Sequence, residues 1–290
     1  MSVVTDDKGK WMNGLSNSTL LGENLIFIVG SPRSGTTHLR RLISSFANIQ
    51  SGRESHLFDH VGLFMDLWHG YAKAIAVDPK YFPAGLPVYF TYEEFIEIMR
   101  QLVSELMKPM IGGLKEGEVF LEKSPSHALH LHTIHELLPK ARIIHILRDP
   151  RDVVASLLAL STNKGSWTPN RADECAKVWC NHVNHVKRTV PSLPPENFFE
   201  LRYETLIDNP TDSLRAIAEF LGMNWSNESI QAAIEANCIE ATRAKFGEDH
   251  VRRGGANYWR KDLTQWQKFR VWQVAGSTMS SVGYDWRFPW

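Results

Sequence analysis

A glycine-containing turn near the start of the sequence constrains the fold more than any other feature. Residues 25–29, Leu-Ile-Phe-Ile-Val, form a continuous apolar run typical of a strand that is buried on both faces. The turn Gly-Ser-Pro-Arg-Ser-Gly-Thr-Thr occupies residues 30–37, and from Thr36 to about Phe46 apolar residues recur at helical spacing. A strand, a tight turn and a helix in this order begin a βαβ unit, which predicts a parallel sheet.

Short apolar runs and helical patterns go on alternating along the chain. Strands are expected at 119–122, 142–147 and 198–201, and helices after the capping box at Thr91 and over 209–222. This order is typical of an α/β fold of three layers, in which helices flank a central parallel sheet.

The chain is expected to form one domain preceded by an extension. Its 290 residues are 43% hydrophobic and 22% charged, the composition of a globular protein. Residues 1–24 are expected to be an N-terminal extension, and 25–290 a single domain. The stretch near 48–90 contains several prolines and aromatic residues, so we expect an irregular insertion there, of the kind that often forms a binding lid.

The balance of charges and the cysteines narrow the choice of partner and compartment. Lys and Arg total 32, as do Asp and Glu, which argues against a broad surface for nucleic acid or anionic membrane. Three cysteines without a C-x-x-C pair favour a reduced, cytoplasmic setting. No early apolar stretch is long enough for a signal peptide or a membrane span.

The turn between Gly30 and Thr37 has the G-x-x-x-x-G frame of a phosphate-binding loop. Backbone N–H groups of the turn and of the new helix converge on one point, where the helix dipole also favours an anion. A nucleotide triphosphatase needs Lys after the second glycine, but here that position is Thr36, and a cation comes earlier, at Arg33. We expect a single 5′-phosphate that bears another transferring group, although a turn that binds nothing remains the alternative.

The turn resembles the 5′-phosphosulfate loop of sulfotransferases that use 3′-phosphoadenosine 5′-phosphosulfate (PAPS). Further segments carry the same resemblance: Arg-Asp-Pro-Arg-Asp-Val-Val-Ala-Ser at 148–156, Leu-Arg-Tyr-Glu-Thr-Leu-Ile-Asp-Asn-Pro at 201–210, and Arg-Arg-Gly-Gly-Ala-Asn-Tyr-Trp-Arg-Lys-Asp-Leu-Thr at 252–264. These segments follow the family's order from about residue 25 to 264. The resemblance implies a P-loop-like α/β fold with a central parallel sheet, PAPS as co-substrate, adenosine 3′,5′-bisphosphate (PAP) as product, and no metal.

The resemblance also assigns binding residues. It implies that the sulfated end meets Arg33, Ser34, Gly35, Thr36 and Thr37, the 3′-phosphate meets Arg148, Ser156, Arg252, Arg253 and Gly254, and the adenine meets Tyr203. In the last segment Asn257 stands where the family has a second glycine. The arginines at 148, 151, 252 and 253 could instead lie on solvated faces, paired with neighbouring aspartates.

Catalysis of sulfuryl transfer needs positioning, charge stabilisation and a base for the acceptor hydroxyl. Lys123 resembles the family's lysine at the leaving phosphate, and Arg33 the matching cation. Glu54 matches the catalytic glutamate of tyrosylprotein sulfotransferases, and His127 lies two residues from the place of the histidine in cytosolic sulfotransferases. We rank Glu54 ahead of His127 as the base. The alternatives are that Glu54 is a solvent-facing carboxylate paired with Arg53 and that His127 only packs.

The acceptor is less constrained by the sequence. We expect a small, hydrophobic hydroxyl compound, such as a metabolite, a lipid, or a β-hydroxyacyl chain tethered to a carrier protein. The aromatic residues of the 48–90 stretch could line an acceptor pocket or belong to the core: Trp68, Tyr71, Tyr81, Phe82, Tyr89 and Phe90.

Two other classes of function remain open. A P-loop nucleotide kinase would bind Mg-ATP, and a nucleotide-binding module would keep the phosphate loops without catalysis. The histidines at 127, 130, 132 and 135 spread over more than one helix face, so no metal site is expected from them.

Overall fold

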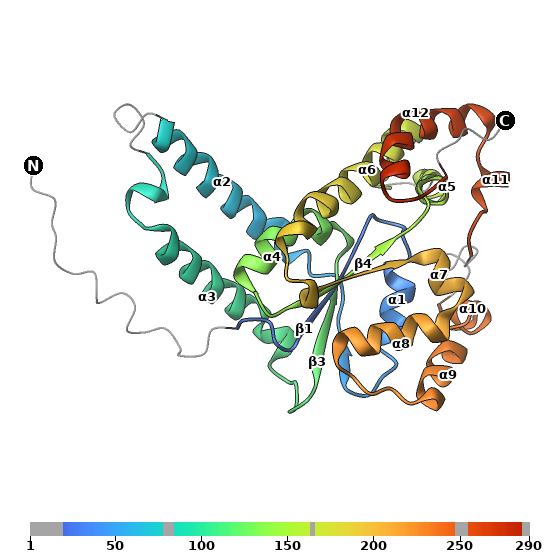
Figure 1. Cartoon of the computed structure of the whole chain (residues 1–290), viewed down its shortest axis with the longest axis horizontal. Helices are drawn as coiled ribbons and strands as arrows, with labels where there is room; N and C mark the ends of the chain where they lie inside the picture. Colours follow the sequence, from blue (N-terminus) through green and yellow to red (C-terminus); the bar gives the residue numbers. More distant parts are fainter. Residues whose placement is uncertain (1–19, 78–83, 163–165, 247–254, 286–290) are drawn as a thin grey trace, which may run out of the picture.

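A five-stranded parallel sheet forms the centre of the molecule, as the computed structural model shows for residues 20–77, 84–162, 166–246 and 255–285 (Figure 1). Its strands run in the order β2 (Ile49–Ser51), β3 (Val119–Lys123), β1 (Leu25–Val29), β4 (Arg142–Leu147) and β5 (Phe198–Arg202). In register, Phe27 of β1 lies beside Glu122 of β3 and Ile143 of β4. The predicted α/β fold with a parallel sheet is confirmed.

Helices cover both faces of the sheet (Figure 1). Those before β4 are α1 (Thr36–Ile43), α2 (Leu57–Val77), η1 (Leu86–Val88), α3 (Tyr92–Ile111), η2 (Pro125–Leu129) and α4 (Leu131–Leu137). Those after β4 are α5 (Pro150–Ser161), α6 (Ala172–Thr189), η3 (Val190–Ser192), η4 (Pro195–Asn197), α7 (Tyr203–Asp208), α8 (Pro210–Leu221), α9 (Asn227–Ala236), α10 (Ile239–Phe246), α11 (Trp259–Asp262) and α12 (Gln265–Ser281).

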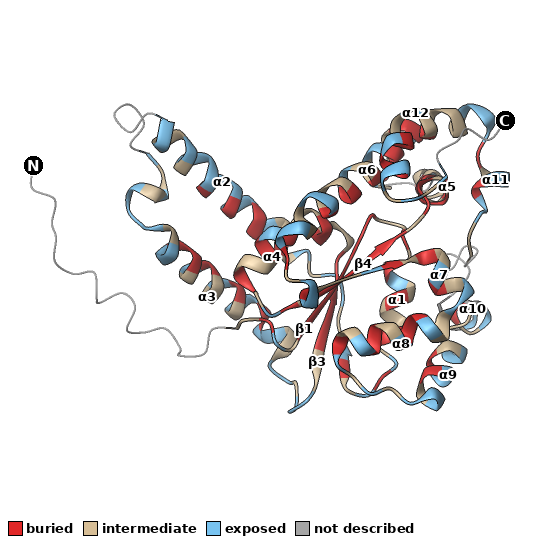
Figure 2. Cartoon of the chain, viewed as in Figure 1, coloured by how far each residue is buried: buried red, intermediate tan, exposed pale blue. Residues whose placement is uncertain are grey.

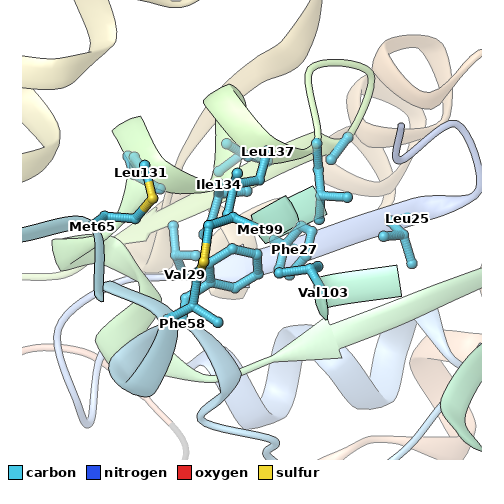
Figure 3. Close-up of a cluster of buried hydrophobic side chains, with 14 of the residues drawn as sticks. Leu25, Phe27, Val29, Phe58, Met65, Met99, Val103, Leu131, Ile134 and Leu137 are labelled. Atoms are coloured by element: carbon cyan, nitrogen blue, oxygen red, sulfur yellow. The ribbon is translucent and has the colours of Figure 1, made fainter. Parts of the chain in front are cut away.

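Strand β1 explains why the core around it has two halves, and a further buried cluster joins α5, α6 and α12. Side chains alternate between the faces of a strand, so Phe27 packs with α2, α3 and α4, while Ile26 and Ile28 pack with α1, α8 and α9. Figure 3 shows the first half, where Phe58 of α2 meets Phe27 edge-on with ring centroids 5.7 Å apart. All five residues of β1 are buried, as expected for a central strand of a parallel sheet.

The expectation of an irregular insertion near 48–90 is wrong for most of that stretch. The stretch contains the edge strand β2 and the long helix α2. Val61, Met65 and Trp68 lie on one buried stripe of α2, but the opposite side exposes Leu63 and Leu67, so the sequence lacks a clear polar face (Figure 2). The prolines that suggested a loop all come after the last residue of this helix.

Candidate active site

The carboxyl ends of four adjacent strands bring the predicted site residues to one edge of the sheet. The glycine turn follows β1, Lys123 is the last residue of β3, Arg148 follows β4 directly, and Tyr203 follows β5. Parallel strands end at the same edge, and ligands of open α/β sheets bind outside that edge. The strand order β3-β1-β4-β5 therefore places these segments side by side.

A cavity of about 660 Å³ lies at this edge. Many of the predicted site residues line it: Arg33, Gly35, Thr36, Thr37, Glu54, Arg148, Ser156 and Tyr203. Lys123 contacts two of these residues, because its ammonium bonds to Glu54 and lies 3.3 Å from the Thr37 hydroxyl. Ser34 is buried beneath the turn. His127 does not line the cavity.

Close approaches of the backbone explain both glycines of the turn. A Cβ atom on Gly30 would lie 2.6 Å from the carbonyl oxygen of Ile146, and one on Gly35 would lie 2.3 Å from the Tyr203 ring. Gly35 also has a φ of 98°, and Arg33 has a φ of 70°, both in the left-handed region. Among the described residues the buried hydroxyl of Ser34 has no hydrogen-bond partner. A polar atom left unpaired at a helix N-terminus fits an anion held by the turn.

Arg148 and Arg151 stand on the same segment but serve different purposes. Arg148 donates to the Arg33 carbonyl at 3.1 Å and to the Gly255 carbonyl at 2.9 Å, and it stacks 4.2 Å from the centroid of the Tyr203 ring. Its buried Nε has no partner among the described residues. Arg151 instead forms a bidentate pair with Asp149. Arg151 therefore fits the alternative that these arginines pair with neighbouring aspartates, whereas Arg148 lines the cavity.

Hydrogen bonds hold the segment after Gly254 against Asp152, which lines the cavity. Asp152 accepts the backbone N–H groups of Asn257 at 2.7 Å and of Trp259 at 2.9 Å. Burial raises the pKa of Asp152, although these two hydrogen bonds oppose the shift. Asn257 has a φ of 66°, so it adopts the left-handed conformation that glycine would otherwise supply. The predicted residues Arg252, Arg253 and Gly254 lie outside the described residues.

Arg33 and Ser156, predicted to serve different ends of the nucleotide, meet in the structure. The Nε of Arg33 donates to the Ser156 hydroxyl at 3.0 Å. Ser156 lies in α5, which begins at Pro150 directly after the Arg148 segment. The contact ties the glycine turn to α5 across the cavity.

Glu54 lies between two cationic groups. One carboxylate oxygen bonds to Lys123, and the other lies 3.2 Å from Nε2 of His56. The other ring nitrogen of His56, Nδ1, lies 2.8 Å from the Asp59 carboxylate. His56 was not among the predicted site residues; its spacing of three residues before Asp59 favours a contact between these two side chains but does not indicate the contact with Glu54.

His127 forms a separate, buried pair with Glu122. Its Nε2 accepts the backbone N–H of Phe58 at 3.1 Å, and its Nδ1 lies 3.1 Å from a Glu122 oxygen. Glu122 also accepts the N–H and the hydroxyl of Ser55, at 3.1 and 2.8 Å. Burial disfavours the Glu122 carboxylate, but the hydrogen bonds from His127 and from the Ser124 hydroxyl outweigh burial and lower the pKa of Glu122 to about 2. Both ring nitrogens of His127 therefore face protein groups rather than the cavity.

Other candidate features lie away from the cavity. Trp68 belongs to the core, where it stacks on Phe95 with centroids 4.1 Å apart, while Tyr71, Tyr89 and Phe90 are exposed and do not line the cavity. Tyr81 and Phe82 lie outside the described residues. In the described part of the chain, no three His, Cys, Asp or Glu side chains are grouped to hold a metal ion, and no helix is long and apolar enough to cross a membrane.

Comparisons with known proteins agree on one family. A model described as the sulfotransferase family matches residues 25–227. The chain is 24% identical to protein-tyrosine sulfotransferase A of Caenorhabditis elegans over 70% of its own length and 51% of that protein. It is 28% identical to the omega-hydroxy-beta-dihydromenaquinone-9 sulfotransferase of Mycobacterium bovis over 72% of its length and 53% of that protein. It therefore spans about half the length of these two relatives.

A solved structure extends the likeness to the fold. A mouse sulfotransferase in complex with PAP superposes with a TM-score of 0.59 at 16% identity, over 90% of this chain and 86% of that one. At this identity the match shows a shared architecture. The fold of the chain therefore agrees with the family that the family model matches.

Proposed function

Because the chain belongs to the sulfotransferase family, we propose that it is a PAPS-dependent enzyme that transfers the sulfuryl group to a hydroxyl of a small, hydrophobic acceptor, with Glu54 as the general base. One observation carries this proposal. The glycine turn, Arg148 and the linked side chains of Lys123 and Glu54 all meet at one cavity. These are the parts that a doubly phosphorylated nucleotide and an in-line transfer require.

The nucleotide would be held mainly by backbone groups and by guanidinium groups. In the proposal the turn binds the sulfated end, and Arg148 with Ser156 binds the 3′-phosphate. Guanidinium groups match the fixed geometry of phosphate oxygens, and the Nε of Arg148 and the hydroxyl of Ser34 are donors without a partner among the described residues. We extend the proposal to Arg252, Arg253 and Gly254 on the strength of the sequence resemblance alone.

Lys123 and Glu54 would then divide the chemistry between them. As the new sulfur–oxygen bond to the acceptor forms and the bond to the leaving phosphate oxygen breaks, Glu54 takes the proton of the acceptor hydroxyl and Lys123 stabilises the negative charge on the leaving group. The burial of His127, with both ring nitrogens engaged, supports the choice of Glu54.

A hydrophobic acceptor is favoured by the exposed apolar residues of helix α2. Helix α2 begins soon after Glu54 and exposes Leu63, Phe64 and Leu67 on its outer side. A contiguous exposed apolar surface often marks a binding site. The names of the relatives show that members of this family act on a lipid-like quinone or on protein tyrosine. We propose a metabolite, a lipid or a carrier-tethered β-hydroxyacyl chain.

Calorimetric titration with PAP and with Mg-ATP tests the nucleotide part. We expect PAP to bind and Mg-ATP to bind weakly or not at all, because Thr36 stands where a triphosphatase has lysine. Tight binding of Mg-ATP without binding of PAP would support a P-loop kinase and overturn the proposal.

Transfer of labelled sulfate from PAPS tests the reaction. The acceptors are 4-nitrophenol, dodecan-1-ol, farnesol, 3-hydroxyoctanoyl pantetheine and an acidic peptide that contains tyrosine. We expect transfer to one of the four small acceptors. Transfer to the peptide alone would overturn the acceptor class. Binding of PAP without transfer to any acceptor or to water would favour a non-catalytic nucleotide-binding module.

A further inference from the structure

His56 lies between two carboxylates, one of which, Glu54, lines the cavity. Its Nε2 is 3.2 Å from Glu54, and its Nδ1 is 2.8 Å from Asp59. The chain of contacts therefore runs Asp59, His56, Glu54, and through Glu54 to Lys123. The side chain of His56 is 47% exposed, so water reaches one part of the ring while Glu54 contacts another.

The hydrogen-bond inventory defines what the ring can do. A carboxylate only accepts hydrogen bonds, and Asp59 also accepts the hydroxyl of Ser126 at 2.7 Å. Burial disfavours the Asp59 carboxylate, but the hydrogen bonds from Ser126 and His56 outweigh burial and lower its pKa, so Asp59 stays an acceptor. The contact with Asp59 therefore uses the proton on Nδ1. This leaves Nε2 either to donate to Glu54 or to accept a proton from it.

The backbone of His56 is held in an unfavourable conformation. Its φ is 51°, in the left-handed region that is uncommon for residues with a side chain, although histidine enters it more often than most of them. Its N–H donates to the Ser124 hydroxyl at 3.1 Å, and the neighbouring N–H of Ser55 donates to Glu122. Contacts from the end of β3 therefore hold the strained residue in place. Strain of this kind persists where the surroundings enforce it, and it is concentrated at functional sites.

We propose that His56 positions Glu54 and carries the proton of each turnover from Glu54 to solvent. This inference rests on the proposed function. The acceptor O–H bond breaks and its proton passes to Glu54; the O–H bond of Glu54 then breaks as an N–H bond forms at Nε2 of His56. Asp59 holds the Nδ1 proton throughout, and the ring releases the Nε2 proton to water. Lys123 occupies the other oxygen of Glu54, which leaves Oε2 for His56.

Two replacements of His56 separate positioning from proton transfer. In His56→Gly the left-handed backbone is relieved of strain and the space of the ring is opened to added imidazole. In His56→Asn the left-handed conformation is still tolerated and the side-chain amide can donate to Glu54, but it cannot carry a proton. His60→Ala is the matched control, because it removes an exposed imidazole one turn along from His56.

The measurements are the Kd for PAP and the kcat with the best acceptor of the panel. We expect His56→Gly to bind PAP as the wild type does but to lose about 10²-fold in kcat, and added imidazole to restore most of that loss. His56→Asn should recover only part of the activity, and His60→Ala should match the wild type. A normal kcat in His56→Gly, no response to imidazole, or full activity in His56→Asn would overturn the proton-carrying role.

The failure of the proposed function would look different. If the wild-type protein binds PAP but sulfates no acceptor of the panel, the acceptor class is wrong. The same His56 variants are then compared by the release of free labelled sulfate to water, whose proton follows the same path through Glu54. Imidazole-dependent release in His56→Gly would support the inference, and release independent of His56 would overturn it.

Discussion

Two carboxylate–histidine pairs flank Lys123, and they differ in almost every physical respect. Glu122 and His127 are both almost fully buried, whereas Glu54 and His56 have side chains that are 39% and 47% exposed. The buried pair makes its contacts within the protein, whereas in the open pair Glu54 lines the cavity and His56 is partly exposed to solvent. A position near the end of a strand therefore does not by itself make a histidine a candidate catalytic residue.

The buried pair also supports the open one. Glu122 accepts the N–H of Ser55, and His127 accepts the N–H of Phe58, so both ends of the segment that carries His56 are fixed to the end of β3. The segment from Glu54 to Phe58 therefore has its backbone positioned by one pair while its side chains form the other. Removal of each pair should damage a different property of the molecule.

The largest expected effect is on turnover in Glu54→Gln. Loss of the base should lower kcat about 10²–10⁴-fold. The Kd for PAP should change little, and so should the midpoint of urea unfolding, because Glu54 is partly exposed. Near-normal turnover would show that Glu54 is not the base and would return this role to His127.

Lys123→Met should have the next largest effect. The methionine fills similar space, but it leaves the departing phosphate without a hydrogen-bond donor, so kcat should fall about 10²–10³-fold. The control is Lys140→Met, which removes an exposed lysine paired with Glu23. If Lys123→Met weakened the binding of PAP but left kcat unchanged, the leaving-group role would be wrong.

The buried pair should instead appear in the pH dependence of stability. The pKa of Glu122 is lowered from 4.5 to about 2 in the folded protein. Its contribution is therefore fully present above pH 4.5 and is lost as the pH falls through 2. The size is about 3 kcal/mol in the free energy of unfolding.

Urea unfolding of the wild type and of Glu122→Gln between pH 5 and pH 3 measures this contribution. Glu122→Gln should unfold more easily at neutral pH and should lose less of its stability as the pH falls. Equal slopes in the two proteins would show that the Glu122 carboxylate is not specially stabilised. Glu54→Gln is the matched control, since it changes a carboxylate of the open pair.

The sequence predicted the parts of the site that depend on local order along the chain. The apolar run and glycine turn define β1 and its loop, and Lys123 and Arg148 stand at the ends of predicted strands. The capping box at Thr91 is likewise present, because its two hydrogen bonds depend only on residues three apart. Such features depend on residues close together in the sequence and not on contacts with distant parts of the chain.

Tertiary contacts decided the rest. The sequence could not show that His127 faces into the core, because a short segment after a strand can point either way. Helix α2 was missed since both of its sides are apolar, which hides the helical period. The role of His56 depends on a contact of Ser126 with Asp59 across 67 positions of sequence. None of these could be read from spacing.

The smallest expected effect belongs to Ser55, the residue that joins the two pairs. Its hydroxyl donates to Glu122 at 2.8 Å and accepts the N–H of Leu57 at 3.2 Å. Ser55→Ala removes both contacts but keeps the backbone bond from Ser55 to Glu122, so we expect a loss of about 1–2 kcal/mol in the free energy of unfolding. The adjacent Glu54 and His56 should then be held less firmly, which predicts a fall in kcat of a few-fold.

Ser55→Thr, which keeps the hydroxyl, should restore both properties together. If the buried pair supports the open one, stability and kcat must move in the same direction in these variants. A large fall in kcat at unchanged stability would instead mean that Ser55 contacts a substrate itself. A loss of stability with full activity would show that the open pair keeps its geometry without the buried one, and the dependence of one region on the other would then be wrong.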